Sequence, residues 1–143
     1  MHQPIRVGDI SVTFLQSRHE TQDLLDVFEI TIPPKLIYPP IPHLHRDYDE
    51  TIIGMNGITT WLVEGKSIQL RPGEELFIPR GSAHAFANRH DGAARIMCIL
   101  TPGLLGPEYF RDLAAVINED EDSFDPCEMG SVMTRYGVIP LNA

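Results

Sequence analysis

Residues 43–50 read HLHRDYDE, and the spacing of their histidines and acids decides how the rest of the chain is interpreted. Side chains two positions apart in a β-strand point to the same face, roughly 6.5 to 7 Å apart, so His43 and His45 can converge on one ion. In one unbroken strand Glu50 would point to the opposite face, because it lies an odd number of positions beyond His45. A turn made by the intervening polar residues would bring Glu50 back toward the imidazoles, at the start of the next strand. Asp49 is a competing carboxylate that this spacing alone does not exclude.

A second segment, residues 73–88 with the sequence GEELFIPRGSAHAFAN, carries a third imidazole. His84 follows a Pro-x-Gly turn and is predicted to lie on a strand. Three neutral imidazoles and one carboxylate suit Fe, Mn, Ni, Co, Cu or Zn, and suit calcium or magnesium poorly. We therefore expect one divalent transition metal per chain, with open positions for water or substrate. Phe86 shares the face of His84 by the two-residue period and is predicted to line the pocket.

The sequence around these segments predicts an all-β fold. Short apolar or alternating runs of strand length are separated by turn pairs such as Asn56-Gly57. Repeated short strands at this spacing are typical of a sandwich or barrel. Trp61, Phe77 and Met97 are expected to fill its interior. The predicted strands are residues 10–15, 24–32, 50–55, 58–63, 67–70, 75–78 and 94–101.

The pattern changes after the last predicted strand. Pro107 suits the first turn of a helix, and the apolar residues that follow it recur on one helical face. We therefore expect a β-barrel domain over residues 1–103 and a C-terminal helix and tail over residues 104–143. The acidic run at 119–122 is interpreted as a solvated loop. The later apolar stretch at 136–141 indicates that the tail returns to pack on the barrel or on a second subunit.

Both histidine segments resemble the motifs of the cupin superfamily. The first motif, G(X)5HXH(X)3,4E(X)6G, is matched except at its opening glycine, near which Tyr38 stands. The second, G(X)5PXG(X)2H(X)3N, is matched at every fixed position between Gly73 and Asn88. The resemblance spans roughly residues 35–102, and agreement at about nine fixed positions is far more specific than a single short motif.

This resemblance implies a cupin-type jelly-roll β-barrel with a C-terminal helical extension that lies outside the motifs. It also implies glycines at turns, where a positive φ or a close backbone approach favours them. The implied metal ligands are His43, His45, Glu50 and His84. The implied turn glycines are Gly57, Gly73 and Gly81.

The resemblance to small quercetinase-like cupins implies a metal-dependent oxidoreductase, a dioxygenase that acts on a small organic substrate inside the barrel. In that chemistry the ion lowers the pKa of substrate oxygens as a Lewis acid, and Glu50 is the catalytic residue that shifts between ligand and base. Because one fold hosts many functions, two alternatives stay open. They are the non-catalytic binding or sensing of a small ligand, and a metal-dependent isomerase or lyase.

The composition limits the partners. With 11 Lys+Arg against 20 Asp+Glu in 143 residues, the net charge of −9 repels phosphate backbones, so no nucleic acid partner is expected. No stretch approaches the roughly 20 apolar residues of a membrane span, and the start lacks the pattern of a signal peptide. We expect a cytoplasmic protein with reduced thiols at Cys98 and Cys127. We also expect a homodimer, because open strand edges need covering. Arg80 and Arg95 are the charged residues expected nearest to the mouth of the pocket, where a guanidinium could orient a carboxylate substrate. The sequence favours the other interpretation, that both are solvated.

Overall fold

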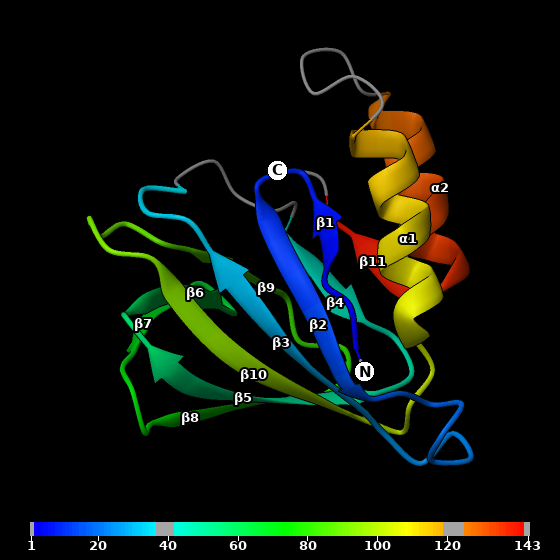
Figure 1. Cartoon of the computed structure of the whole chain (residues 1–143), viewed down its shortest axis with the longest axis horizontal. Helices are drawn as coiled ribbons and strands as arrows, with labels where there is room; N and C mark the ends of the chain where they lie inside the picture. The colour runs from blue at the N-terminus through cyan, green and yellow to red at the C-terminus, as the bar shows by residue number, and fades with distance from the viewer. Residues whose placement is uncertain (1, 37–41, 119–124, 142–143) are drawn as a thin grey trace.

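The alternating runs of the sequence form two antiparallel β-sheets in the computed structural model, which describes residues 2–36, 42–118 and 125–141. Figure 1 shows the long strands of the first sheet running across the molecule, with the second sheet behind them. The first sheet has the strand order β1 (Ile5–Val7), β2 (Ile10–Gln16), β3 (Asp26–Ile32), β10 (Ala94–Thr101), β5 (Asp49–Asn56) and β8 (Glu75–Ile78). The second has the order β11 (Val138–Pro140), β4 (His43–His45), β9 (His84–Ala87), β6 (Thr59–Val63) and β7 (Lys66–Leu70).

The predicted β fold is confirmed at the level of these two sheets. Within the described ranges no strand of one sheet pairs with a strand of the other, so the closed jelly-roll barrel stays a prediction. Tyr38 and the acidic run at 119–122 lie outside the described residues. The three motif glycines have the positive φ that the resemblance implies, with values of 69° at Gly57, 85° at Gly73 and 83° at Gly81. At Gly57 a Cβ would also lie 2.6 Å from the carbonyl oxygen of Ala93, so this turn admits no side chain.

The core lies between the sheets and follows the two-residue period of the strands. In β10 every second residue is buried, from Ala94 to Leu100, and its partner β5 alternates in the same way. Trp61 is buried as predicted, and its indole N–H donates to the hydroxyl of Thr59 at 2.8 Å. Phe77 does not fill the interior, because its side chain is 58% exposed on the outer face of β8, beside the exposed Glu75.

The C-terminal segment holds more structure than the sequence predicted. Helix α1 (Gly106–Ile117) is confirmed, but a second helix, α2 (Pro126–Arg135), and strand β11 follow it. The two helices pack against each other, with α1 against β1 and α2 against β11 (Figure 1). The tail returns to the second sheet of its own chain, where Val138 pairs with His45 and Pro140 with His43. Among the described residues, neither helix has the length and hydrophobicity to cross a bilayer.

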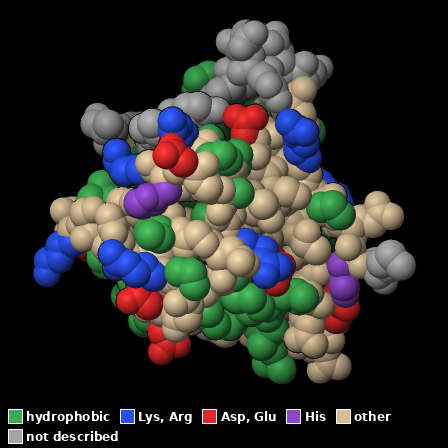
Figure 2. Space-filling model, turned by 60° about the vertical axis from the view of Figure 1, so that its left-hand side comes forward, with side chains coloured by type: hydrophobic (Ala, Val, Ile, Leu, Met, Phe, Trp, Pro, Cys, Tyr) green, Lys and Arg blue, Asp and Glu red, His purple; other side chains and the backbone are tan. Residues whose placement is uncertain are grey.

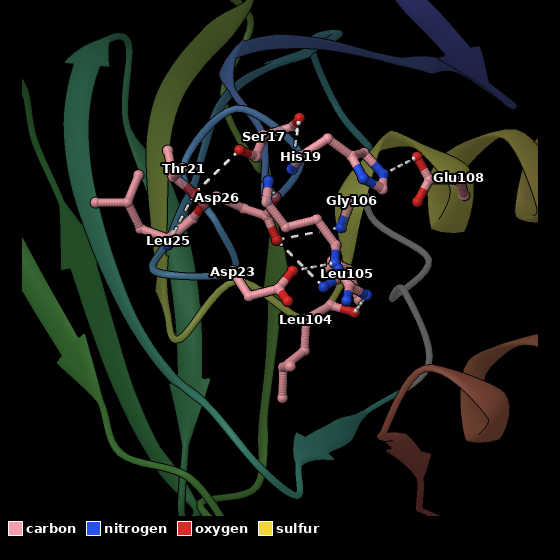
Figure 3. A network of polar contacts seen from close by, with 11 residues as sticks. Ser17, His19, Thr21, Asp23, Leu25, Asp26, Leu104, Leu105, Gly106 and Glu108 are labelled. Atoms are coloured by element: carbon pink, nitrogen blue, oxygen red, sulfur yellow. Dashed lines mark hydrogen bonds and ion pairs between the residues drawn. The ribbon is translucent and has the colours of Figure 1, made fainter.

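A buried carboxylate fixes the position of α1. Asp26, at the start of β3, is fully buried and accepts hydrogen bonds from the backbone N–H groups of Leu105 at 3.2 Å and Gly106 at 3.1 Å (Figure 3). Its other oxygen accepts from the backbone N–H of Arg18 at 2.7 Å. Because the first N–H groups of a helix have no partner inside the helix, a carboxylate is favourable there. In the loop between β2 and β3, Nε2 of His19 lies 2.7 Å from Oε1 of Glu108. This is a second contact between that loop and α1.

Candidate metal centre

Three imidazoles meet between the sheets. His43 and His45 come from β4, and His84 comes from the neighbouring β9, where it pairs directly with His43. One ring nitrogen of each histidine lies within 4.8 Å of the corresponding nitrogens of the other two. His45 and His84 are only 7% and 3% exposed. Three converging nitrogen donors of this kind could hold a transition metal ion, and the donor set does not select among such metals.

The carboxylate of Glu50 reaches the same cluster from the opposite sheet. Its Oε1 lies 3.4 Å from Nε2 of His84 and 3.7 Å from Nδ1 of His45, and the side chain is buried. The backbone bends at residues 46–47, so that β5 starts at Asp49 with Glu50 facing inward. Asp49 instead faces outward and pairs with Arg80, whose backbone N–H and guanidinium both donate to it. The structure therefore places Glu50, and not Asp49, beside the imidazoles.

The charges at the cluster favour an ionised carboxylate. Burial raises the pKa of Glu50, but the hydrogen bond from His84 and the charges of the imidazoles outweigh it, so the net shift is downward. At His84 burial lowers the pKa, but the hydrogen bond and charge of Glu50 outweigh burial and the net shift is upward. Burial lowers the pKa of His45 to about 4, against the opposing charge of Glu50. An ionised carboxylate beside a neutral His45 is the protonation pattern that metal ligands need.

The orientation of His84 is set by the backbone. Its Nδ1 lies 2.9 Å from the carbonyl oxygen of Ser82, and a carbonyl can only accept, so Nδ1 carries the hydrogen. The other nitrogen, Nε2, is then the one that faces Glu50 and the imidazoles with its lone pair, when the ring is neutral. A carbonyl that fixes the tautomer in this way is the usual outer partner of a metal-bound histidine. The orientation of the His45 ring is supported by packing, because the ring of Tyr48 stacks on it with centroids 4.6 Å apart.

A cavity of about 370 Å³ opens on the cluster. Phe86, which the sequence predicted at the pocket, lies in its wall beside Trp61. Both C-terminal helices contribute to the same wall, with Leu113 of α1 and Met133 of α2 among the lining residues. No lysine or arginine lies among the described lining residues. A ligand here therefore contacts apolar side chains on most sides and polar groups mainly near the histidines.

Neither Arg80 nor Arg95 lines the cavity, so a position at its mouth is not supported, and both contact surface side chains. Arg80 pairs with Asp49, and the guanidinium of Arg95 donates to the side chain of Asn56 at 2.9 Å. Figure 2 shows one face of the molecule on which Lys and Arg side chains lie close to Asp and Glu side chains. On that face the positive charges are thus dispersed.

Two residues of the site were missed by the sequence analysis. Cys98 lines the cavity that Glu50 also lines, and burial together with the charge of Glu50 raises the pKa of its thiol. Tyr109 of α1 lines the cavity as well. The alternation of buried residues in β10 places Cys98 on the inward face, and this pattern could have identified it as a residue of the site. The helical period placed Tyr109 on an apolar face, but it does not tell which surface that face covers.

A family model described as "Cupin domain" matches residues 28–100. The chain belongs to the cupin family. The match starts in β3 and ends in β10, so it includes all four of the residues discussed as ligands and leaves α1, α2 and β11 outside. Cupin membership thus covers the candidate metal centre but not the helical part of the cavity wall.

Two curated proteins resemble this cupin over part of its length. Quercetin 2,3-dioxygenase of Bacillus subtilis (strain 168) is 33% identical over 89 residues, which are 62% of this chain and 25% of that protein. A protein of Aquifex aeolicus (strain VF5), described as uncharacterized, is 28% identical over 71 residues, which are 50% of this chain and 58% of that protein. The chain therefore matches about a quarter of the length of the dioxygenase and somewhat more than half of the length of the Aquifex aeolicus protein.

Solved structures show the same fold at lower identity. A predicted oxalate decarboxylase from Thermotoga maritima has a TM-score of 0.63 at 16% identity, covering 71% of this chain and 92% of that one. A sugar phosphate isomerase of the cupin superfamily from Silicibacter pomeroyi has a TM-score of 0.58 at 20% identity, covering 68% and 62%. At these identities the likeness supports the fold and does not transfer a function.

Proposed function

We propose that this cupin is a metal-dependent oxidoreductase, a dioxygenase acting on a small organic substrate in the cavity. The observation that carries the proposal is the convergence of three imidazoles and a buried carboxylate on the wall of a mainly apolar cavity. The partial likeness to a quercetin 2,3-dioxygenase supports the choice of reaction. A cavity of this volume is within the range of small-molecule sites.

Each residue of the site has its own role in this proposal. His43, His45 and His84 hold one divalent transition metal per chain through ring nitrogens, and Glu50 is the fourth ligand. When bound, the metal supplies Lewis-acid and redox chemistry toward substrate oxygen atoms. Glu50, ionised in the site, accepts a proton from an enolic or phenolic hydroxyl and is therefore also the catalytic base. The apolar wall, which includes Phe86, keeps water away from the reacting groups.

Oxygen consumption tests this proposal directly. Protein reconstituted separately with iron(II), manganese(II) and nickel(II) is mixed with a flavonol or a catechol in an oxygen-electrode cell, and the products are identified by mass spectrometry. We expect uptake that depends on both metal and substrate, and its loss in the His84→Ala variant. If no metal form consumes oxygen with either substrate, the dioxygenase assignment is contradicted.

Two other functions for the same site give different outcomes. A binding or sensing protein would return the ligand unchanged from a stable complex. An isomerase or lyase would turn over its substrate under anaerobic conditions. A phosphorylated substrate is disfavoured, because no cation lies among the described lining residues. An anaerobic assay with product analysis therefore separates all three.

The cytoplasmic location and the homodimer are part of the proposal. The free thiol of Cys98, next to Glu50, supports a reducing compartment. Each sheet has an exposed apolar side chain that a second copy would cover, Phe77 on β8 and Leu62 on β6. Figure 2 shows hydrophobic side chains gathered on the lower part of the face in view. Light scattering on the purified protein checks the dimer, and a monomeric mass contradicts it.

A further inference from the structure

Helix α1 brings a phenol into the cavity wall. Tyr109 lies in the first turn of α1, three residues after Gly106, whose backbone N–H donates to Asp26 of β3. Figure 3 shows this contact between Asp26 and the start of the helix. Its side chain is only 6% exposed and lines the cavity that also contains Glu50. The ring packs against Phe110 and Tyr136, with centroid distances of 5.1 Å and 5.3 Å. The helix thus presents this side chain from a well-anchored position.

The hydroxyl of Tyr109 has no protein partner in the described part of the chain, where no hydrogen bond to it is found. The neighbouring Tyr136 differs, because its hydroxyl donates to the carboxylate of Asp112 at 2.6 Å. The buried hydroxyl without a partner in this part of the molecule is that of Tyr48, whereas Tyr109 lines the cavity. A cavity-lining hydroxyl without a protein partner is available to bond a water molecule or a ligand. The cavity is where a ligand for this hydroxyl can lie.

The surroundings keep the phenol protonated. Burial raises the pKa of Tyr109, and the negative charge of Glu50 raises it further. Tyr109 therefore acts as a hydrogen-bond donor over the whole working range of pH. Its neighbours in the cavity wall are mostly apolar, among them Leu105, Leu113 and Phe28. A donor in such a setting selects an acceptor oxygen on an otherwise apolar molecule.

We propose that the hydroxyl of Tyr109 donates a hydrogen bond to a carbonyl or ether oxygen of an apolar cyclic ligand, which makes Tyr109 a specificity-determining residue of this cavity. The inference rests on the proposed function in one respect, since both place the ligand in the same cavity. It does not depend on oxygen chemistry, because recognition by Tyr109 needs no metal.

The test uses metal-free protein and two probes that differ by one carbonyl oxygen, 1-tetralone and tetralin. Trp61, the single tryptophan of the chain, lines the cavity and reports binding through its fluorescence, and calorimetry gives an independent dissociation constant. Tyr109→Phe is expected to weaken binding of 1-tetralone roughly three- to tenfold, as for the loss of one hydrogen bond. Binding of tetralin should not change.

Tyr136→Phe is the matched control, because it removes a hydroxyl from an adjacent ring that bonds Asp112 and does not line the cavity. It should leave both affinities unchanged. Equal weakening of the two probes by Tyr109→Phe, or no change for either, overturns the inference and leaves the dioxygenase proposal to the oxygen-uptake assay. If the wild type binds neither probe, apolar recognition in this cavity is wrong. Oxygen uptake with a flavonol then still decides the dioxygenase proposal separately.

Discussion

Glu50 connects the two sheets at the site, since it lies on β5 and faces histidines of β4 and β9. Replacing it with glutamine keeps its size and removes its charge. We expect Glu50→Gln to weaken binding of a divalent metal by on the order of 10- to 100-fold, because a ligand and the charge that balances the cation are lost together. Competition with a chromogenic chelator measures this affinity.

Asp49→Asn is the control for that measurement. It removes the adjacent carboxylate, which faces outward and pairs with Arg80, so metal affinity should stay within about twofold of the wild type. If Asp49→Asn weakened binding as much as Glu50→Gln, the inward carboxylate would have been assigned to the wrong residue.

The two cysteines differ in reactivity. Cys98 is fully buried, and burial together with the charge of Glu50 raises the pKa of its thiol well above the usual range. Cys127 is exposed at the start of α2. Because the thiolate is the reactive form, we expect one fast-reacting thiol per native chain and a second only after unfolding. A disulfide reagent read at a visible wavelength, with and without guanidinium, counts both; two fast thiols in the native protein would contradict the placement of Cys98.

At the scale of elements, the anchoring of α1 is open to a stability measurement. Asp26→Ala removes the acceptor of three backbone N–H groups that stay buried or partly buried. We expect the free energy of unfolding to fall by roughly 3 kcal/mol, because hydrogen bonds to a charged acceptor are strong and their loss leaves donors unsatisfied. Guanidinium unfolding followed by circular dichroism gives the value.

Asp23→Asn serves as the comparison, because Asp23 lies in the loop before β3, is exposed and pairs with the side chain of Arg18, and asparagine tolerates its φ of 64°. This substitution should cost less than about 1 kcal/mol. Equal losses for the two variants would mean that Asp26 acts only as another surface acid and does not hold the helix.

The motif spacing predicted which residues of the candidate metal centre lie together, because β-strands and tight turns are local. Two-residue alternation and a short polar bend are enough to bring His43, His45 and Glu50 together. The same alternation failed at Phe77, since a short edge strand gives few positions from which to choose its inward face. Phe77, a large aromatic residue on an edge strand, was therefore predicted to lie in the core.

Helix α2 and strand β11 were not predicted, for different physical reasons. The α2 segment contains Gly130 and has polar residues on much of its surface, so its helical period is weak. Strand β11 has three residues, too few to show a period, and its partner β4 lies far away in the sequence. Such pairing depends on tertiary packing, which no local pattern contains.

For the whole molecule, the metal should act as a bridge between the sheets. Its proposed ligands come from β4 and β9 on one side and β5 on the other. An ion that binds only the folded state adds about 2.7 kcal/mol to the free energy of unfolding when its free concentration is one hundred times its dissociation constant. For a chain of this size the midpoint of thermal unfolding should then rise by roughly 10 °C.

Scanning calorimetry of chelator-treated and metal-loaded protein measures this difference. His84→Ala, which lacks one ligand, should show little change between the two conditions. A wild type whose midpoint does not respond to any of the six candidate metals would show that the cluster does not hold an ion in the folded protein.

The pairing of β11 with β4 also has a consequence for the order of folding during synthesis. A ribosome releases the chain from its N-terminal side, so the histidines of β4 emerge long before residues 138–140, which cover the free edge of that strand. Until then, imidazoles that attract copper and zinc strongly lie on an incompletely paired strand. The outer edge of β4 is therefore open to pairing with another chain until residues 138–140 are available.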